Sequence, residues 1–175
     1  MIPRIQGRGH SFMGVTAYLM HDKEAITSDR VAWTETGNLR TNDVEKAAKI
    51  MAWTDMHREE IRTHHRIENP EGKTSPAAGR KGYSGNVYHL SLAWAPGETP
   101  SEAHQRAAAR EFLEHHGLFH LQHYMVGHND TDHVHVHMVV NLVDRQTGNI
   151  HKLGLDKRRA QAWALEYERE HGMHC

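Results

Sequence analysis

The stretch that decides the fold is His128-Asn129-Asp130-Thr131-Asp132-His133-Val134-His135-Val136-His137-Met138-Val139-Val140-Asn141. From residue 133 to residue 142 the side chains alternate in character, which predicts a β-strand because successive side chains point to opposite faces of a sheet. One face carries His133, His135, His137, Val139 and Asn141, and the other carries Val134, Val136, Met138, Val140 and Leu142. The aliphatic face predicts contact with a hydrophobic core. The imidazole face predicts a functional site.

A second strand is expected directly before this one, at residues 121–128, with turn-forming residues at 129–132. In an antiparallel hairpin His128 would lie roughly opposite His133 and on the same face of the sheet. His128, His135 and His137 would then converge, and three nitrogen ligands with an open coordination position are typical of a catalytic metal site. The alternative is a polar strand face in a histidine-rich chain, whose imidazoles would repel one another when charged or be desolvated without partners.

Length and composition favour one globular domain spanning residues 1–175, because 38% of the 175 residues are hydrophobic. No apolar run reaches the roughly 20 residues needed to span a bilayer. The single cysteine, Cys175, excludes an internal disulfide, which is consistent with a reducing cytoplasm. The net charge of -1 with neutral histidines does not by itself indicate nucleic-acid binding.

The remaining elements follow from periodicity and capping residues. Further strands are expected at 1–6 and 87–95, and helices at 11–22, 42–63, 99–117 and 156–171. Asn42 is the expected cap of the second helix, and Thr99 with Pro100 opens the third. Residues 26–39 are expected to form a loop-rich connection. The sequence predicts an α/β fold with a central, mostly antiparallel sheet of about five strands, helices on its outer face and the histidine strand near its middle.

Residues 69–85 are rich in glycine, proline and serine and predict a flexible loop. The loop carries basic residues, including Arg80 and Lys81, and one aromatic residue, Tyr83. A basic loop of this kind can contact single-stranded nucleic acid through charge and stacking. It can equally be a solvent-exposed loop without a partner.

Three metal chemistries remain open from the residues alone. The first is a zinc-bound hydroxide in a hydrolase, and the second is an iron site of two histidines and a carboxylate, which could use Asp130. In the third, a metal polarises a phosphodiester while a protein hydroxyl attacks it. Tyr18, in the helix expected at residues 11–22, would supply such a hydroxyl.

The pattern His128-x-Asp130-x-x-His133-x-His135-x-His137, followed by Val139-Val140-Asn141, closely resembles the third motif of conjugative relaxases. These are the mobilization nucleases of the superfamily named for its His-hydrophobic-His signature. Residues 7–22 are similar to the first motif of that family, which bears its nucleophile, and residues 33–39 resemble its Trp-x-x-Thr-x-Asn-Leu segment. Residues 89–98 resemble its central strand and turn, and residues 156–171 resemble its last helix. The resemblance covers nearly the whole chain.

The resemblance implies a site-specific and strand-specific DNA nickase and rejoining enzyme that acts at a plasmid transfer origin. Carried onto this chain, it makes His128, His135 and His137 the metal ligands. It makes Tyr18 the nucleophile that forms a 5′-phosphotyrosyl link to DNA, with His21 and His10 as minor alternatives because some relatives use histidine. His133 and Asp130 are expected to lie next to the ligands without binding the metal, with His133 orienting Asp130, Asp132 or the phosphate.

The working ion implied by the resemblance is Mg²⁺ or Mn²⁺, although three imidazoles bind several transition metals more tightly than Mg²⁺. The expected partners are single-stranded transfer-origin DNA, auxiliary relaxosome proteins and a secretion coupling protein, in the bacterial cytoplasm and without a membrane. Trp33, Arg80 and Lys81 are the expected DNA contacts. The alternatives are a rolling-circle replication initiator or transposase with the same chemistry, and a metal-dependent DNA-binding module without cleavage.

Overall fold

The computed structural model describes residues 1–21, 29–69, 85–129 and 133–171. Five strands form one sheet in the order β1-β3-β5-β4-β2, and all neighbouring strands are antiparallel. The strands are β1 (Ile2–Gly9), β2 (Val31–Gly37), β3 (Val87–Ala93), β4 (His123–His128) and β5 (His135–Asn141). The helices are α1 (Phe12–Met20), α2 (Val44–Met56), α3 (Arg58–Glu68), α4 (Glu102–His115) and α5 (Asp156–His171). The predicted α/β fold with a five-stranded antiparallel sheet and a central histidine strand is confirmed.

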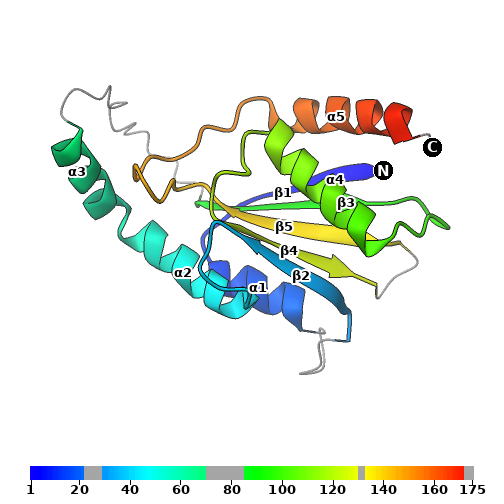
Figure 1. The fold of residues 1–175 in the computed structure, drawn as a ribbon, viewed down its shortest axis with the longest axis horizontal. Helices are drawn as coiled ribbons and strands as arrows, with labels where there is room; N and C mark the ends of the chain where they lie inside the picture. The colour runs from blue at the N-terminus through cyan, green and yellow to red at the C-terminus, as the bar shows by residue number, and fades with distance from the viewer. Residues whose placement is uncertain (22–28, 70–84, 130–132, 172–175) are drawn as a thin grey trace.

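Helices cover both faces of the sheet rather than one outer face (Figure 1). Helices α4 and α5 pack on one face, where the core includes Val136 and Met138 of the histidine strand. Helices α1 and α2 pack on the other face, where Tyr124 and Val126 of β4 and Val139 of β5 are buried. The second face is also the imidazole face. Its aliphatic half is covered by helices, and its other half carries the histidines.

The hairpin of β4 and β5 differs in register from the expected one. His128 pairs with His135 rather than with His133, because β5 begins at His135. The expected pairing was therefore wrong by two residues. Since side chains alternate with a period of two, a shift of two residues leaves the same side chains on the same face. His128, His135 and His137 share a face in either register.

Two predicted helix starts are also corrected by the structure. Asp43, not Asn42, caps α2, because its carboxylate accepts hydrogen bonds from the backbone N–H groups of the first turn at 2.9 and 3.1 Å. Ser101, not Thr99, caps α4 with its hydroxyl. The long helix expected at residues 42–63 is divided at His57 into α2 and α3.

Strand β2 lies where a loop-rich connection was expected. Trp33 and Glu35 lie two residues apart and share the strand face that packs against α4. The residues on this inward face are therefore not all apolar. The Glu35 carboxylate lies 2.7 Å from Arg106 and 2.8 Å from Arg110. Although burial opposes it, these two guanidinium groups hold the pKa of Glu35 below its usual value. The two ion pairs offset the cost of removing the carboxylate from water, so Glu35 can occupy a partly buried strand position.

The buried histidine of β4 predicts an acid-sensitive fold. His123 is 1% exposed, and burial lowers its pKa. The folded protein therefore keeps this ring neutral below about pH 6.5, where the unfolded chain binds a proton, so stability falls as pH decreases. We expect the melting temperature to fall between pH 7 and pH 5, at a cost of at most about 1.4 kcal/mol per pH unit for this residue. His123→Asn should show a shallower decrease in thermal denaturation; an unchanged slope would contradict this assignment.

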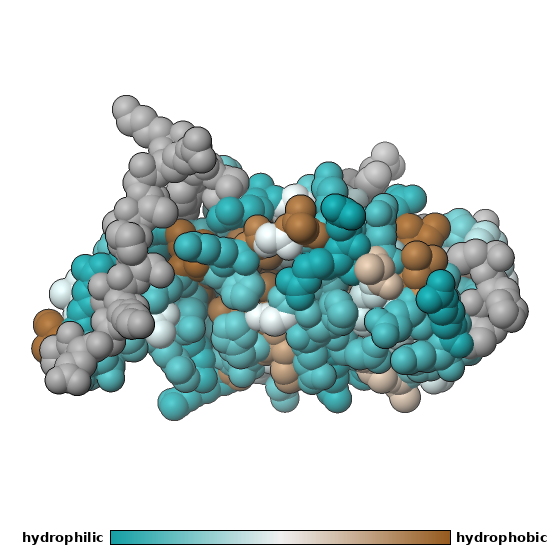
Figure 2. Space-filling model, turned by 90° about the horizontal axis from the view of Figure 1, so that it is seen from above, coloured by the Kyte–Doolittle hydropathy of each residue, from teal (hydrophilic) through white to brown (hydrophobic). Residues whose placement is uncertain are grey.

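No helix in the described part of the chain is long and apolar enough to cross a membrane. The face seen from above in Figure 2 is mostly hydrophilic, with its hydrophobic residues scattered among hydrophilic ones. Scattered apolar residues of this kind are ordinary on protein surfaces.

Candidate metal centre and nucleophile

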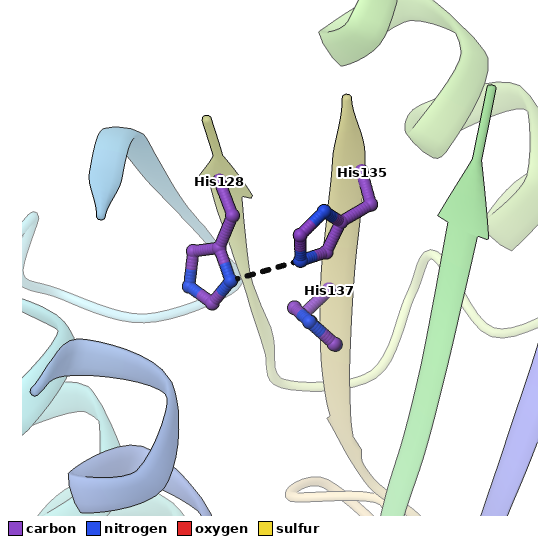
Figure 3. A group of neighbouring side chains, drawn as sticks. All are labelled: His128, His135 and His137. Carbon is purple, nitrogen blue, oxygen red and sulfur yellow. Dashed lines mark hydrogen bonds between the residues drawn. The ribbon is translucent and has the colours of Figure 1, made fainter. Parts of the chain in front are cut away.

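Three histidines from the central hairpin point toward one another (Figure 3). His128 is the last residue of β4, and His135 and His137 lie on the facing strand β5. One ligand nitrogen from each ring lies within 4.8 Å of the other two. The Nδ1 atom of His128 and the Nε2 atom of His135 are 3.2 Å apart. The predicted convergence of these three rings is present in the structure.

Each ring is oriented by a hydrogen bond of its other nitrogen. Nε2 of His128 lies 2.8 Å from the carbonyl oxygen of Leu19, and Nδ1 of His135 lies 2.9 Å from the carbonyl oxygen of His133. Both nitrogens must donate, because a carbonyl oxygen only accepts. Nδ1 of His137 lies 3.0 Å from Nε2 of His89. The other nitrogens, Nδ1 of His128 and Nε2 of His135 and His137, face the centre of the group, where Nδ1 of His128 also contacts Arg30. Metal-binding histidines are usually oriented in this way.

The electrostatics of the group suit a cation. Burial, followed by the nearby charges of His89, His128, His135 and Arg30, lowers the pKa of His137 to about 2. The ring is therefore neutral at physiological pH, and a neutral imidazole is the form that binds metals. Since their other nitrogens donate to carbonyls, Nδ1 of His128 and Nε2 of His135 present lone pairs to each other across 3.2 Å, and Nη2 of Arg30 lies 3.3 Å from the first. Such lone pairs repel unless a positive group lies between them. The donor set therefore fits a divalent ion.

Tyr18 is placed next to this group by helix α1. The hydroxyl of Ser11 caps the helix by accepting from the N–H of Gly14 at 2.9 Å. Tyr18 lies in the last turn and is 51% exposed, whereas its neighbour Leu19 is fully buried. Because the Leu19 carbonyl accepts the hydrogen bond from His128, the segment that carries Tyr18 is joined directly to a candidate metal ligand.

Two further residues belong to the site and were missed in the sequence. His89 of β3 contacts His137, and burial, followed by the charge of His128, lowers the pKa of His89 to about 4. Arg30, which directly precedes β2, lies beside Tyr18 and His128. In the sequence, alternation along residues 87–95 puts His89 on the strand face opposite Tyr88 and Trp94, and this is the signal that could have indicated it. No local pattern indicated Arg30.

Of the other residues expected at the site or in contact with DNA, the structure describes His133 but not Asp130, Arg80 or Lys81. The side chain of His133 is exposed, and it is the backbone carbonyl of this residue that contacts His135. Asp130, Arg80 and Lys81 lie outside the described residues, so their expected roles stay predictions.

The alternative histidine nucleophiles lie beyond the ends of α1. His21 follows its last turn, and its Nε2 lies 3.7 Å from the carboxylate of Glu45. His10 is exposed at the end of β1, before the helix. Neither belongs to the three-histidine group that the described residues form.

Trp33, an expected DNA contact, is buried in the structure. Trp33 is 6% exposed and lies in the core between the sheet and α4, on the face opposite the three histidines. Its Nε1 donates to Gln105 at 2.8 Å, and the Arg106 guanidinium lies 4.2 Å from its ring. A side chain added at Gly127 would collide with the ring, since its Cβ would lie 2.2 Å from Nε1. The ring therefore has no open face on which a base can stack.

Trp33→Phe should reduce stability and leave DNA affinity unchanged. The substitution removes the donor to Gln105, whose side chain is buried, so the free energy of unfolding should fall by about 1–3 kcal/mol. Chemical denaturation measures the loss, and fluorescence anisotropy with labelled single-stranded DNA measures the affinity. Weaker binding by the folded variant would return Trp33 to the DNA surface.

A comparison with protein families agrees with this geometry. The model of a relaxase family, described as the MobA/VirD2-like nuclease domain, matches residues 18–173. The matched region begins at Tyr18 and contains all three histidines of the candidate metal centre. No curated protein shows a significant match. Because the family match spans most of the chain, the protein belongs to the MobA/VirD2-like relaxases and carries their nuclease domain.

Proposed function

We propose that this relaxase domain nicks and rejoins one DNA strand at a specific site of a plasmid transfer origin, through attack of Tyr18 beside a divalent metal ion. Family membership supports DNA binding and nicking in mobilization. The observation that carries the finer proposal is the 2.8 Å contact between Nε2 of His128 and the carbonyl oxygen of Leu19. It sets the residue after Tyr18 against the three-histidine group.

The three histidines would hold the metal through the nitrogens that face the centre. Three neutral imidazoles favour Mn²⁺ over Mg²⁺, which prefers oxygen ligands, and we propose one of these two as the working ion. When bound, such an ion draws charge from the oxygens of a phosphodiester as a Lewis acid. The hydrogen bonds that Nδ1 of His137 donates to His89 and that Nδ1 of His135 donates to the His133 carbonyl would keep the rings in the required orientation.

Tyr18 would perform the covalent step. Its oxygen forms a bond to phosphorus while the bond between phosphorus and the 3′ oxygen breaks. The phenol proton is lost, and the departing 3′ oxygen takes up a proton and becomes a hydroxyl group. The step exchanges one phosphoester for another and involves no oxidation or reduction. The 3′-hydroxyl can therefore attack the phosphotyrosyl bond and reseal the strand.

The DNA would lie on the part of the sheet face beside the histidines. Arg4 of β1 pairs with Ser91 of β3, which in turn pairs with His137, so these residues share that face. Arg4 is exposed there, and Gln6 lies 2.8 Å from the Ser91 hydroxyl. An exposed guanidinium at this position suits a phosphate backbone. We propose single-stranded transfer-origin DNA as the substrate, and auxiliary relaxosome proteins and a secretion coupling protein as partners in the bacterial cytoplasm.

The test is incubation of the protein with end-labelled single-stranded oligonucleotides that carry candidate transfer-origin nick sites. Reactions contain Mn²⁺, Mg²⁺ or a chelator and are resolved on a denaturing gel. We expect a nicked product and a protein-DNA band that survives denaturation, both dependent on metal. Adding an oligonucleotide with a free 3′-hydroxyl should then yield a rejoined strand.

The control outcomes separate the alternatives. Hydrolysis without a covalent band would indicate metal-hydroxide chemistry rather than tyrosine attack. Binding with no reaction at any site, in protein that holds metal, would indicate a DNA-binding module.

A further inference from the structure

Arg30 occupies the space between the proposed nucleophile and the proposed metal ligands. It directly precedes β2, whose first residue Val31 pairs with His128. Its backbone carbonyl accepts a hydrogen bond of 3.1 Å from the N–H of Asn129. Its backbone is thereby fixed to the chain that follows β4.

The guanidinium group contacts both sides of the site. Nη1 donates to the carbonyl oxygen of Tyr18 at 3.4 Å, and the Arg30 Cζ atom lies 5.8 Å from the centre of the Tyr18 ring. Nη2 lies 3.3 Å from Nδ1 of His128. Since Nε2 of His128 donates to the Leu19 carbonyl, Nδ1 carries the lone pair that accepts from Arg30.

The bond to Nδ1 conflicts with the metal-binding role of the same atom. One lone pair cannot both accept a hydrogen bond from Arg30 and coordinate a cation. In the metal-bound protein the Nη2 donor must therefore turn to another acceptor. The contact to the Tyr18 carbonyl does not depend on Nδ1, so the guanidinium can remain beside the tyrosine.

We propose that Arg30 binds the phosphate that Tyr18 attacks and is a catalytic residue of the nicking reaction. This inference rests on the proposed function of Tyr18 and of the three histidines. A guanidinium presents a planar fork of donors that matches two oxygens of a phosphate group. Beside Tyr18, that fork can hold the phosphate next to the attacking oxygen. Its positive charge also stabilises the charge that develops on the phosphate oxygens as the bond forms.

The substitution Arg30→Gln tests this role, with Arg158→Gln as the matched control. Arg158 is exposed on α5, across the sheet from the histidines. Arg158→Gln therefore removes one positive charge, as Arg30→Gln does, but far from the site. We expect Arg30→Gln to nick roughly 10²–10³-fold more slowly than the unaltered protein. Arg158→Gln should nick at the normal rate.

A second measurement detects the phosphate contact without cleavage. In a Tyr18→Phe background with Mn²⁺, dissociation constants are compared for two oligonucleotides, one with a normal phosphate and one with a neutral methylphosphonate at the nick site. The normal phosphate should be preferred, and Arg30→Gln should reduce this preference about tenfold, as expected for loss of a charge-assisted hydrogen bond. Arg158→Gln should leave it unchanged.

A third measurement separates a phosphate contact from support of the metal site. Mn²⁺ titration without DNA should show equal or tighter binding in Arg30→Gln, because a competing donor and a positive charge are removed from Nδ1. Weaker Mn²⁺ binding would assign Arg30 a structural role and overturn the inference.

The two proposals fail in different ways. An undiminished phosphate preference in Arg30→Gln, together with loss of the covalent product in Tyr18→Phe, would overturn the role of Arg30 alone. A covalent product that persists in Tyr18→Phe would overturn the proposed function itself.

Discussion

Tyr18→Phe should abolish the covalent protein-DNA product and reduce strand nicking by at least about 10³-fold, because it removes the attacking oxygen. The change deletes one atom from a side chain that is 51% exposed, so folding should be preserved. Affinity for the uncleaved strand should also be preserved. Denaturing gels measure the product, and fluorescence anisotropy measures the affinity.

Tyr167→Phe is the matched control for this experiment. Tyr167 lies on α5, across the sheet from the histidines, and its hydroxyl is 3.0 Å from Nε2 of His104. Its loss should reduce stability slightly and leave nicking intact. A covalent band of normal intensity in Tyr18→Phe would place the nucleophile elsewhere, and His21 and His10 would be the next residues to substitute.

His135→Ala should weaken Mn²⁺ binding by at least about 100-fold. Loss of a residue that only orients a metal ligand lowers metal affinity by up to about 100-fold, and loss of a ligand itself should lower it at least as much. Of the three histidines, His135 is the most exposed, so this substitution disturbs the core least. Metal-dependent nicking should be lost with the metal. Isothermal titration calorimetry measures the affinity of the protein without DNA.

His64→Ala provides the comparison for His135→Ala. His64 is exposed on α3, which has no buried residues in the structure. Removing its imidazole should leave both Mn²⁺ affinity and nicking unchanged. Equal Mn²⁺ affinity in the two variants would show that the ion binds outside the three-histidine group.

The sequence predicted the histidine group because its placement depends on alternation alone. Side chains two residues apart share a strand face, and a hairpin brings His128 to that face in any register shifted by an even number of residues. The register itself was wrong by two residues, since the bounds of β5 depend on packing that turn-forming residues do not specify. The Tyr18 assignment came from the family resemblance rather than from its own segment.

Residues that were missed or misplaced depend on contacts between distant parts of the chain. Strand β2 carries Glu35 on the side that faces α4, and the ion pairs with Arg106 and Arg110 make this partly buried position compatible with a carboxylate. For the same reason Trp33 was taken as a surface residue, although it packs under α4. Arg30 precedes this strand and reaches the site through the sheet pairing of β2 with β4.

The two halves of the site lie on elements of different kinds, a central strand and a short helix. Strand β5 is hydrogen-bonded on both edges, to β3 and to β4, so hydrogen exchange should be slow at its backbone amides. Helix α1 has nine residues, too few to be stable in isolation, and it depends on its contacts with neighbouring elements. We therefore expect slower hydrogen exchange in the strand that carries His135 and His137 than in the helix that carries Tyr18. If Tyr18 carries the DNA end as we propose, a local opening of α1 would move that end aside and break the hydrogen bond from His128 to the Leu19 carbonyl, while His135 and His137 stay in place on β5.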